Sequence, residues 1–259
     1  MPAADLELLT GAARAAGEIA LRYWKASPQV WDKGGDEGPV TEADLAVNAM
    51  LEARLREARP AYGWLSEESP DTPARRDCEH VFMIDPIDGT SAFIAGESTF
   101  SHALAVARNG VVTAAAVYLP ARDLMFAATF DGPATCNGKA ISASRQAGIA
   151  GANVLTAKAN LAPQHWIGAV PAVTRSFRAS VAHRLCLVAT GEFDGMLSFR
   201  QAWEWDIAAG ALIAERAGAV VTDRNGAALR FNAEVPRSNG VLVAAPGLHA
   251  ALLARLAPR

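Results

Sequence analysis

Two aspartates stand three positions apart in MIDPIDGTSAF, residues 83–93, within and directly after a short apolar run. The proline between them fixes a backbone angle and the following glycine permits a tight turn. We therefore expect the chain to leave a strand at Asp85 and to begin a short helix near Thr90. A helix N-terminus presents free N–H groups that suit a phosphate, and Asp85 and Asp88 offer the hard oxygen ligands that Mg²⁺ prefers. The stretch predicts a cation site next to a phosphate site.

A purely structural interpretation of this stretch stays open. In that interpretation Asp85 caps the end of the strand, Asp88 caps the helix that follows, and Gly-Thr belongs to a turn. The stretch alone does not decide between the two.

Two further segments carry acidic side chains next to apolar residues. WLSEES, residues 64–69, contains Glu67 and Glu68, and EWDIAAG, residues 204–210, places Asp206 at the start of a predicted helix. Each has a plain explanation by itself, a solvated turn for the glutamates and an N-cap for Asp206. The three segments together favour chemistry over structure.

WLSEES, DPIDGTSAF and EWDIAAG, in this order and at this spacing, resemble the motifs of the inositol monophosphatase superfamily of Mg²⁺-dependent, lithium-sensitive phosphatases. The resemblance covers nearly the whole chain and includes VTEAD, residues 40–44. It implies an α/β (α+β) fold, a layered αβαβα sandwich similar to inositol monophosphatase and fructose bisphosphatase. It also implies a phosphoric monoester hydrolase with two or three Mg²⁺ ions per active site.

The resemblance assigns roles to the acidic residues. The groups that it implies as ligands of two metals are Glu67, Asp85, the backbone carbonyl of Ile87, Asp88 and Asp206. Asp85 would bridge the two metals. The Thr90 hydroxyl, with Glu67, would orient the attacking water, so the expected catalytic residues are Glu67, Asp88 and Thr90.

The substrate contacts implied by the resemblance lie in two places. Backbone N–H groups of Gly89, Thr90 and Ser91 would bind the phosphate. Ser180 and Asp206 would contact the rest of the substrate, although capping of a helix explains Ser180 equally well.

A third metal, or a supporting role, is implied for three more residues, Thr41, Asp44 and Glu68. Thr41 and Asp44 fit a capping box at the start of a helix equally well. Lys33 stands where related enzymes have a lysine on a mobile loop, and a solvated lysine is the alternative.

The identity of the phosphate ester is predicted from departures from the inositol pattern. Inositol-preferring members have a glutamate seven residues before the last aspartate, where this chain has Phe199. LSEES and Glu204 are more similar to bacterial 3′(2′),5′-bisphosphate nucleotidases. The first expectation is therefore hydrolysis of adenosine 3′,5′-bisphosphate to AMP, with inositol-1-monophosphatase and then histidinol-phosphatase as alternatives, and fructose bisphosphatase still open.

Arginines offer partners for a second phosphate on such a substrate. Arg178, Arg184 and Arg200 are the candidates, and a surface charge is the plain alternative for each. Ala179 stands where the family usually has a glycine, so a backbone contact to the substrate there is in doubt.

Three other functional classes are considered. Haloacid dehalogenase-like phosphatases use D-x-D-G-T with one residue between the aspartates, whereas Pro86 and Ile87 give two here. A metabolite-binding regulator on the same fold would be expected to lack a metal ligand, and all the acidic side chains are present. A net charge of −3 with a pI near 6.0 gives no footprint for nucleic acid or an anionic membrane.

Hydrophobic periodicity and turn residues predict the elements that must position these groups. A helix with one apolar face is expected from Leu6 to Tyr23. Further helices are expected at 41–59, 181–190, 206–217 and the C-terminus. Strands are expected at 80–85, 101–107, 111–118, 124–128, 154–157, 195–199, 219–222 and 241–245, with Asn-Gly turns at 109–110 and 137–138 and an exposed loop at 32–39.

We expect residues 1–259 to form one catalytic unit with two α/β halves, about 1–145 and 146–259. No signal peptide or long apolar span is seen at the sequence level, and three scattered cysteines indicate no disulfide framework. The expected location is cytoplasmic, the expected partner is a small-molecule phosphate ester, and a homodimer is left open.

Overall fold

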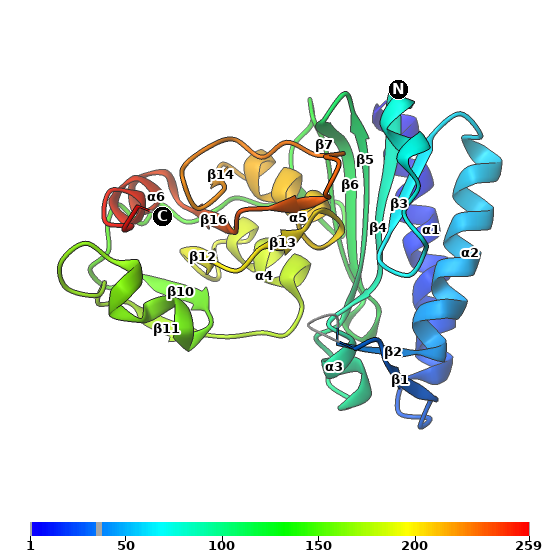
Figure 1. The fold of residues 1–259 in the computed structure, drawn as a ribbon, viewed down its shortest axis with the longest axis horizontal. Coiled ribbons are helices and arrows are strands. Elements are labelled where there is room, and N and C mark those ends of the chain that lie inside the picture. Colours follow the sequence, from blue (N-terminus) through cyan, green and yellow to red (C-terminus); the bar gives the residue numbers. More distant parts are fainter. Residues whose placement is uncertain (1, 35–37, 259) are drawn as a thin grey trace.

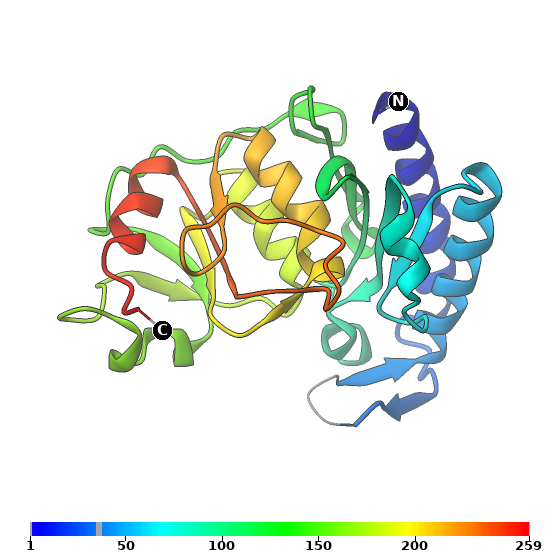
Figure 2. The same ribbon diagram turned by 45° about the horizontal axis from the view of Figure 1, so that its top comes forward.

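The structure is a computed structural model that describes residues 2–34 and 38–258. Helices and sheets alternate in layers (Figure 1). Helices α1 (Pro2–Tyr23) and α2 (Glu42–Ala58) cover one face of a seven-stranded sheet, and α4 (Val181–Ala189) and α5 (Glu204–Arg216) cover the other. A five-stranded sheet follows, with α6 (Pro246–Leu253) on its outer face (Figure 2). This is the αβαβα order that the resemblance implies.

The seven-stranded sheet has the order β3-β4-β5-β6-β7-β8-β9, so neighbours in sequence are neighbours in space. Strands β3 and β4 are parallel, and each later pair is antiparallel. The strands are β3 (Gly63–Ser66), β4 (His80–Asp88), β5 (Ser101–Arg108), β6 (Val111–Leu119), β7 (Leu124–Thr129), β8 (Thr135–Cys136) and β9 (Lys139–Ala140).

Strand β5 shows how this sheet contributes to two cores. Ala103, Ala105 and Ala107 belong to the core shared with α4 and α5, whereas Leu104 and Val106 belong to the core under α1 and α2. Successive side chains of a strand point to opposite faces, so an apolar strand buried on both sides serves both layers.

The five-stranded sheet has the order β11-β10-β12-β16-β14. Strand β10 is parallel to β11 and β12, and β16 is antiparallel to β12 and β14. The strands are β10 (Asn153–Thr156), β11 (Thr174–Ser176), β12 (Gly195–Ser198), β14 (Val220–Thr222) and β16 (Val241–Ala244).

Helices α4 and α5 pack closely where α5 has Gly210. A Cβ atom at Gly210 would lie 2.6 Å from the Cβ of Leu185, which is too close for two carbon atoms. Every residue of α4 is buried between the sheets. The glycine of EWDIAAG therefore sets how closely the helix that carries Asp206 approaches α4.

Smaller elements complete the fold. They are the ribbon of β1 (Val30–Asp32) and β2 (Pro39–Thr41), the ribbon of β13 (Ala202–Trp203) and β15 (Arg237–Ser238), α3 (Thr90–Ile94), and the 3₁₀ helices η1 (Pro73–Asp77), η2 (Pro120–Arg122), η3 (Lys158–Leu161) and η4 (Pro163–His165).

The turn predictions are confirmed by backbone angles. Asn109 and Gly110 have φ of 48° and 80°, and Asn137 and Gly138 have 48° and 76°. Positive φ at both central residues is what a tight hairpin turn requires, and asparagine and glycine tolerate it.

Two predicted boundaries are wrong. Strand β4 continues to Asp88 instead of ending at Asp85, with a register shift against β5 between these residues. Helix α5 begins at Glu204, so Asp206 lies in its first turn and is not an N-cap. Strand β4 continues through Pro86 because a proline is tolerated at a bulge, where the ladder is already interrupted.

The stretch at 32–39 is not simply an exposed loop, because Asp32 and Pro39 pair in the β1–β2 ribbon. Residues 35–37 lie outside the described residues. The three cysteines are free, as expected. Within the described chain, no helix combines the length and apolar character needed to cross a bilayer. The division into two halves near residue 145 stays a prediction.

Candidate active site

Three carboxylates from distant parts of the chain meet at one end of the first sheet. Glu67 directly follows β3, Asp85 lies in β4, and Asp206 lies in the first turn of α5. Each offers an oxygen, and these oxygens lie within 4.8 Å of one another. The sequence predicts these three as metal ligands, and the fold brings their side chains together.

Asp85 is the most deeply enclosed member of this carboxylate cluster. It is 1% exposed, and within the part of the chain that the structure describes its Oδ1 atom has no hydrogen-bond partner. Burial raises the pKa of Asp85 well above its usual value, and the charges of Glu67, Asp88 and Asp206 add to the effect. A buried, unpaired carboxylate oxygen among like charges fits a cation, and three carboxylates fit a hard one such as Mg²⁺.

The pKa values of the other two cluster members, Glu67 and Asp206, are raised as well. Burial raises the pKa of Glu67 from 4.5 to about 7, against the opposing charge of Lys33. Burial and the neighbouring charges of Asp88 and Glu67 raise the pKa of Asp206 well above its usual value. Full ionisation of the cluster at neutral pH is therefore unfavourable unless a cation neutralises the carboxylates.

Asp88 makes contacts that the sequence does not predict. Its carboxylate accepts hydrogen bonds from the Ser180 hydroxyl at 2.5 Å and from the N–H groups of Val181 and Ala182 at 3.0 and 2.6 Å. Asp88 therefore binds the N-terminus of α4, whereas the structural interpretation of the sequence expects it to cap α3. The N-cap of α3 is Gly89, with φ of 92°.

Gly89 brings the starts of α3 and α4 together. A Cβ at Gly89 would lie 3.2 Å from both the Cβ and the backbone nitrogen of Ser180. The positive φ and this close approach both favour glycine. The phosphate-binding N–H groups expected at Gly89, Thr90 and Ser91 therefore adjoin the N-terminus of α4.

Ser180 is the N-cap of α4, which confirms its capping interpretation. Its hydroxyl oxygen accepts from the N–H of His183 at 2.9 Å, donates to Asp88, and lies 3.0 Å from the Ser101 hydroxyl. Through these contacts the Ser180 hydroxyl holds the start of α4 against Asp88. Direct contact between Ser180 and the substrate stays a prediction.

Thr90 connects α3 to the capping box at α2. Its hydroxyl lies within donating distance of the Ile87 carbonyl, at 3.0 Å, and of Asp44 Oδ1, at 3.2 Å. Asp44 also accepts from the N–H and the hydroxyl of Thr41, so the predicted capping box is confirmed. Burial raises the pKa of Asp44 from 3.8 to about 6.

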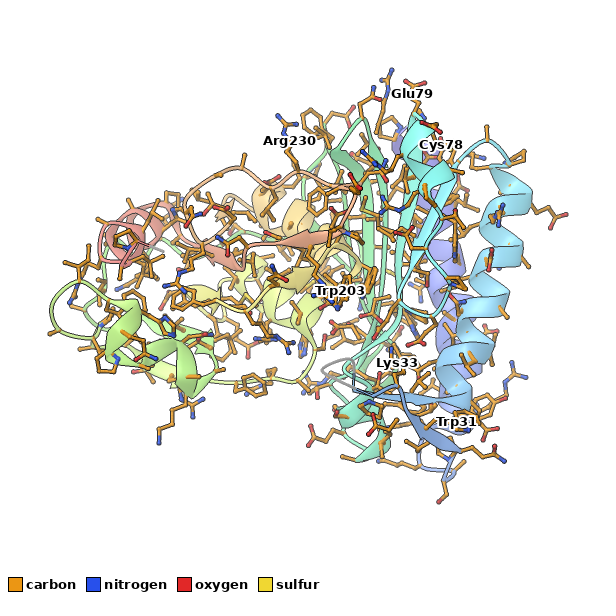
Figure 3. All side chains as sticks on the ribbon, in the orientation of Figure 1. Trp31, Lys33, Cys78, Glu79, Trp203 and Arg230 are labelled. Atoms are coloured by element: carbon orange, nitrogen blue, oxygen red, sulfur yellow. The ribbon has the colours of Figure 1, made fainter. Side chains whose placement is uncertain are left out.

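Lys33 contacts the glutamates instead of solvent. Its ammonium donates to Glu67 Oε1 and to Glu68 Oε1, each at 2.8 Å. Figure 3 shows Lys33 near the β1–β2 ribbon, above α3. The lysine therefore supplies a positive charge to Glu67, a member of the carboxylate cluster.

Replacing Lys33 by methionine is expected to strengthen Mg²⁺ binding about two- to fivefold. The ammonium is a competitor for Glu67, and a partly exposed ion pair contributes at most about 1 kcal/mol. Isothermal titration calorimetry with Mg²⁺ measures the change, and Lys158→Met, outside the carboxylate cluster, is the control. Weaker Mg²⁺ binding in Lys33→Met would show that the lysine assists the cation instead of competing with it.

The candidate arginines fall into two groups. Arg184 is buried on α4, its Nε donates to the Ser180 carbonyl at 3.3 Å, and burial lowers its pKa to about 10, partly offset by Asp88 and Asp206. The charge of Arg200 also acts on Asp206. Arg178 instead donates to the Phe177 carbonyl. Arg184 and Arg200 thus lie near the carboxylate cluster.

Phe199 and Glu204 both have structural surroundings. Phe199 is buried in the core of the second sheet, and its ring centroid lies 5.7 Å from that of Trp166. Glu204 accepts hydrogen bonds from the N–H groups of Asn232 and Ala233, at 2.6 and 3.0 Å. Glu204 therefore holds the chain before β15 against the start of α5, which accounts for it without any nucleotide.

His102 is a residue near the site that motif reasoning does not find. It is fully buried on β5, and its Nδ1 contacts the Pro86 carbonyl, between the two aspartates of the DPID segment. The signal in the sequence is one histidine beside the apolar run of β5, without any motif spacing.

The family model that matches this chain describes the inositol monophosphatase family and covers residues 3–259. A relative named inositol-1-monophosphatase, from Rhizobium meliloti (strain 1021), is 32% identical over 197 residues, which are 72% of this chain and 73% of that protein. Another, named putative Nus factor SuhB, from Neisseria meningitidis serogroup B, is 32% identical over 225 residues, which are 83% and 85% of the two chains.

Solved structures agree with these relatives. The extragenic suppressor protein suhB from Bartonella henselae superposes with a TM-score of 0.83 at 25% identity, covering 97% of each chain. An IMPase from Thermotoga maritima superposes with a TM-score of 0.81 at 25% identity, covering 98% of this chain and 96% of that one. With its carboxylate cluster at the same motifs that predicted it, this chain belongs to the inositol monophosphatase family, a family of phosphoric monoester hydrolases.

Proposed function

We propose that this protein is a Mg²⁺-dependent phosphomonoesterase. The groups that would bind Mg²⁺ are Glu67, Asp85, Asp88, Asp206 and the carbonyl of Ile87. The observation that carries the proposal is the convergence of Glu67, Asp85 and Asp206, with oxygens within 4.8 Å and one buried Asp85 oxygen unpaired among the described residues. Carboxylates pressed together and buried in this way are costly unless a cation neutralises them.

The chain's own groups have distinct roles in this proposal. Bound Mg²⁺ would supply the Lewis acidity that activates water and stabilises charge on the leaving oxygen. The N–H groups at Gly89–Ser91 would hold the phosphate at the start of α3. Thr90 and Glu67 would orient the attacking water, with the Thr90 hydroxyl held between Asp44 and the Ile87 carbonyl.

A nucleoside 3′,5′-bisphosphate is the substrate that we infer first. Arg184 and Arg200 place two positive charges near Asp206, where a second phosphate would find partners. Phe199, buried in an apolar core, replaces the acidic group that a polyol would meet. Glu204 no longer supports this choice, because backbone N–H groups occupy its carboxylate.

Inositol 1-phosphate is the second candidate. It is supported by the relative named inositol-1-monophosphatase, which aligns with 72% of this chain. Other relatives at similar identity carry the name Nus factor SuhB, so relatedness by itself does not select a substrate.

A substrate panel with and without Mg²⁺ and Li⁺ tests both parts of the proposal. We expect phosphate release to require Mg²⁺, to be inhibited by Li⁺, and to be fastest with adenosine 3′,5′-bisphosphate among that compound, inositol 1-phosphate, histidinol phosphate and fructose 1,6-bisphosphate. Mg²⁺-independent turnover would reject the mechanism. A tenfold preference for inositol 1-phosphate would reject only the substrate.

Arg200→Gln is expected to raise KM for adenosine 3′,5′-bisphosphate about tenfold, since a charged hydrogen bond contributes about 1.5–3 kcal/mol. The kcat/KM for inositol 1-phosphate should stay within about twofold, because that ester has no second phosphate. Arg200 is exposed, so the fold should persist, and Arg178→Gln is the matched control. Equal losses for both substrates would argue against a second-phosphate contact.

A further inference from the structure

The metal-binding segment of β4 leaves the regular ladder opposite His102. Asp85 pairs with Ala103 and Asp88 pairs with Ser101, so Pro86 and Ile87 together face one residue of β5. Such a bulge leaves backbone groups without ladder partners, and a buried carbonyl requires a donor from elsewhere.

The side chain of His102 supplies that donor. Its Nδ1 contacts the carbonyl oxygen of Pro86, and because a carbonyl only accepts, Nδ1 carries the proton. The other nitrogen, Nε2, is buried and has no partner among residues 2–34 and 38–258. The single hydrogen bond to Pro86 is therefore the polar contact that holds this ring.

The ring has little freedom to turn away. His102 is fully buried and lies between Phe100 and Tyr118, with ring centroids at 6.3 and 6.5 Å. Both neighbours belong to the core beneath α1 and α2. Close packing thus keeps Nδ1 directed at the Pro86 carbonyl.

Fixing the Pro86 carbonyl constrains the groups on either side of it. The Pro86 carbonyl and the Ile87 N–H belong to one planar peptide unit. A hydrogen bond to the Pro86 carbonyl therefore fixes the orientation of this unit, which directly precedes the Ile87 carbonyl. Asp85 precedes this peptide, and Thr90 contacts the Ile87 carbonyl from the other side at 3.0 Å. His102 and Thr90 thus hold two consecutive carbonyls of the DPID segment.

We propose that His102 is a positioning residue, which donates from Nδ1 to Pro86 and thereby orients the Ile87 carbonyl and the Asp85 carboxylate toward the cation. The inference rests on the proposed Mg²⁺ site and adds a residue that none of the motifs contains. His102 acts through the backbone and touches neither substrate nor metal.

Calorimetric titration of Mg²⁺ into the purified full-length protein tests this role, with three variants. His102→Leu keeps a similar apolar volume and removes the donor. His102→Asn places an amide N–H near the position of Nδ1 and restores it. Val106→Ala, on the same face of β5, makes a comparable defect in the same core without touching the DPID segment.

We expect Mg²⁺ to bind His102→Leu about tenfold or more weakly than wild type, the range typical of lost outer-shell partners of a metal. His102→Asn should remain within about threefold of wild type. Val106→Ala should bind Mg²⁺ like wild type despite a lower Tm. In activity assays His102→Leu should need more Mg²⁺ for half-maximal rate while its KM for substrate at saturating Mg²⁺ stays near wild type.

Four results would overturn the inference. They are wild-type Mg²⁺ affinity in His102→Leu, equal losses in His102→Leu and His102→Asn, an equal loss in Val106→Ala, and ¹⁵N spectra that place the His102 proton on Nε2. Absence of Mg²⁺ binding to the wild type would instead reject the proposed function, and this inference with it.

Discussion

Asp85→Asn is expected to lower Mg²⁺-dependent phosphatase activity by more than about 100-fold while raising the stability of the metal-free protein. Loss of an outer-shell partner alone costs up to about 100-fold in affinity or activity, and Asp85 would hold the cation directly, with Glu67 and Asp206. The same carboxylate is buried among like charges, which raises its pKa well above the usual value. A neutral amide removes that repulsion.

Steady-state kinetics over a Mg²⁺ series and thermal unfolding in EDTA measure the two effects of Asp85→Asn. Asp194→Asn is the matched control, because Asp194 also accepts hydrogen bonds, from Ser144 and from the Asn153 N–H, yet lies outside the carboxylate cluster. The control should lose stability and keep its Mg²⁺ response. Near-wild-type turnover in Asp85→Asn would exclude Asp85 as a metal ligand.

Without a divalent cation, the free energy of unfolding is expected to fall as the pH rises from about 4 to above 7, because the carboxyls with raised pKa outnumber His102 and His183, whose pKa burial lowers to about 4 and whose contribution has the opposite sign. Folding raises the pKa of Asp44 from 3.8 to about 6 and that of Glu67 from 4.5 to about 7, in each case chiefly by burial. Asp85 and Asp206 shift in the same direction. A carboxyl with a raised folded-state pKa binds more protons when folded, so its stabilising contribution is present at low pH and is lost as the pH rises through that pKa.

Mg²⁺ should largely remove this pH dependence at neutral pH. A ligand at 100 times its Kd stabilises the folded state by about 2.7 kcal/mol per site. Urea unfolding at pH 5, 6, 7 and 8 measures the free energy of unfolding against pH, once in EDTA and once in saturating Mg²⁺. The prediction fails if stability in EDTA rises with pH, or if Mg²⁺ stabilises the protein equally at pH 5 and pH 8.

Local signals in the sequence account for much of the fold. The Asn-Gly turns at 109–110 and 137–138 lie where predicted, with positive φ at each residue. The capping box at Thr41 and Asp44 also forms as predicted. These features depend on a few adjacent residues, so no distant contact is needed to recognise them.

Predictions that depended on distant contacts were incomplete. Asp88 binds the N-terminus of α4, more than ninety positions away in the chain, instead of the helix that follows it. Lys33 reaches Glu67 and Glu68 instead of solvent. Helix α5 begins earlier than expected, at Glu204, whose carboxylate accepts hydrogen bonds from N–H groups of the segment before β15.

Three acidic motifs determined the family and the class of reaction from the sequence alone, because residue type and spacing along the chain are preserved in the letters. The tertiary structure decided that Asp85 is buried with an unpaired oxygen among the described residues, and that His102 meets the Pro86 carbonyl. These contacts depend on how β4 bulges against β5. The bulge depends on how the two strands pair, so the energetic cost of burying the carboxylates together and their final positions appear only in the folded chain.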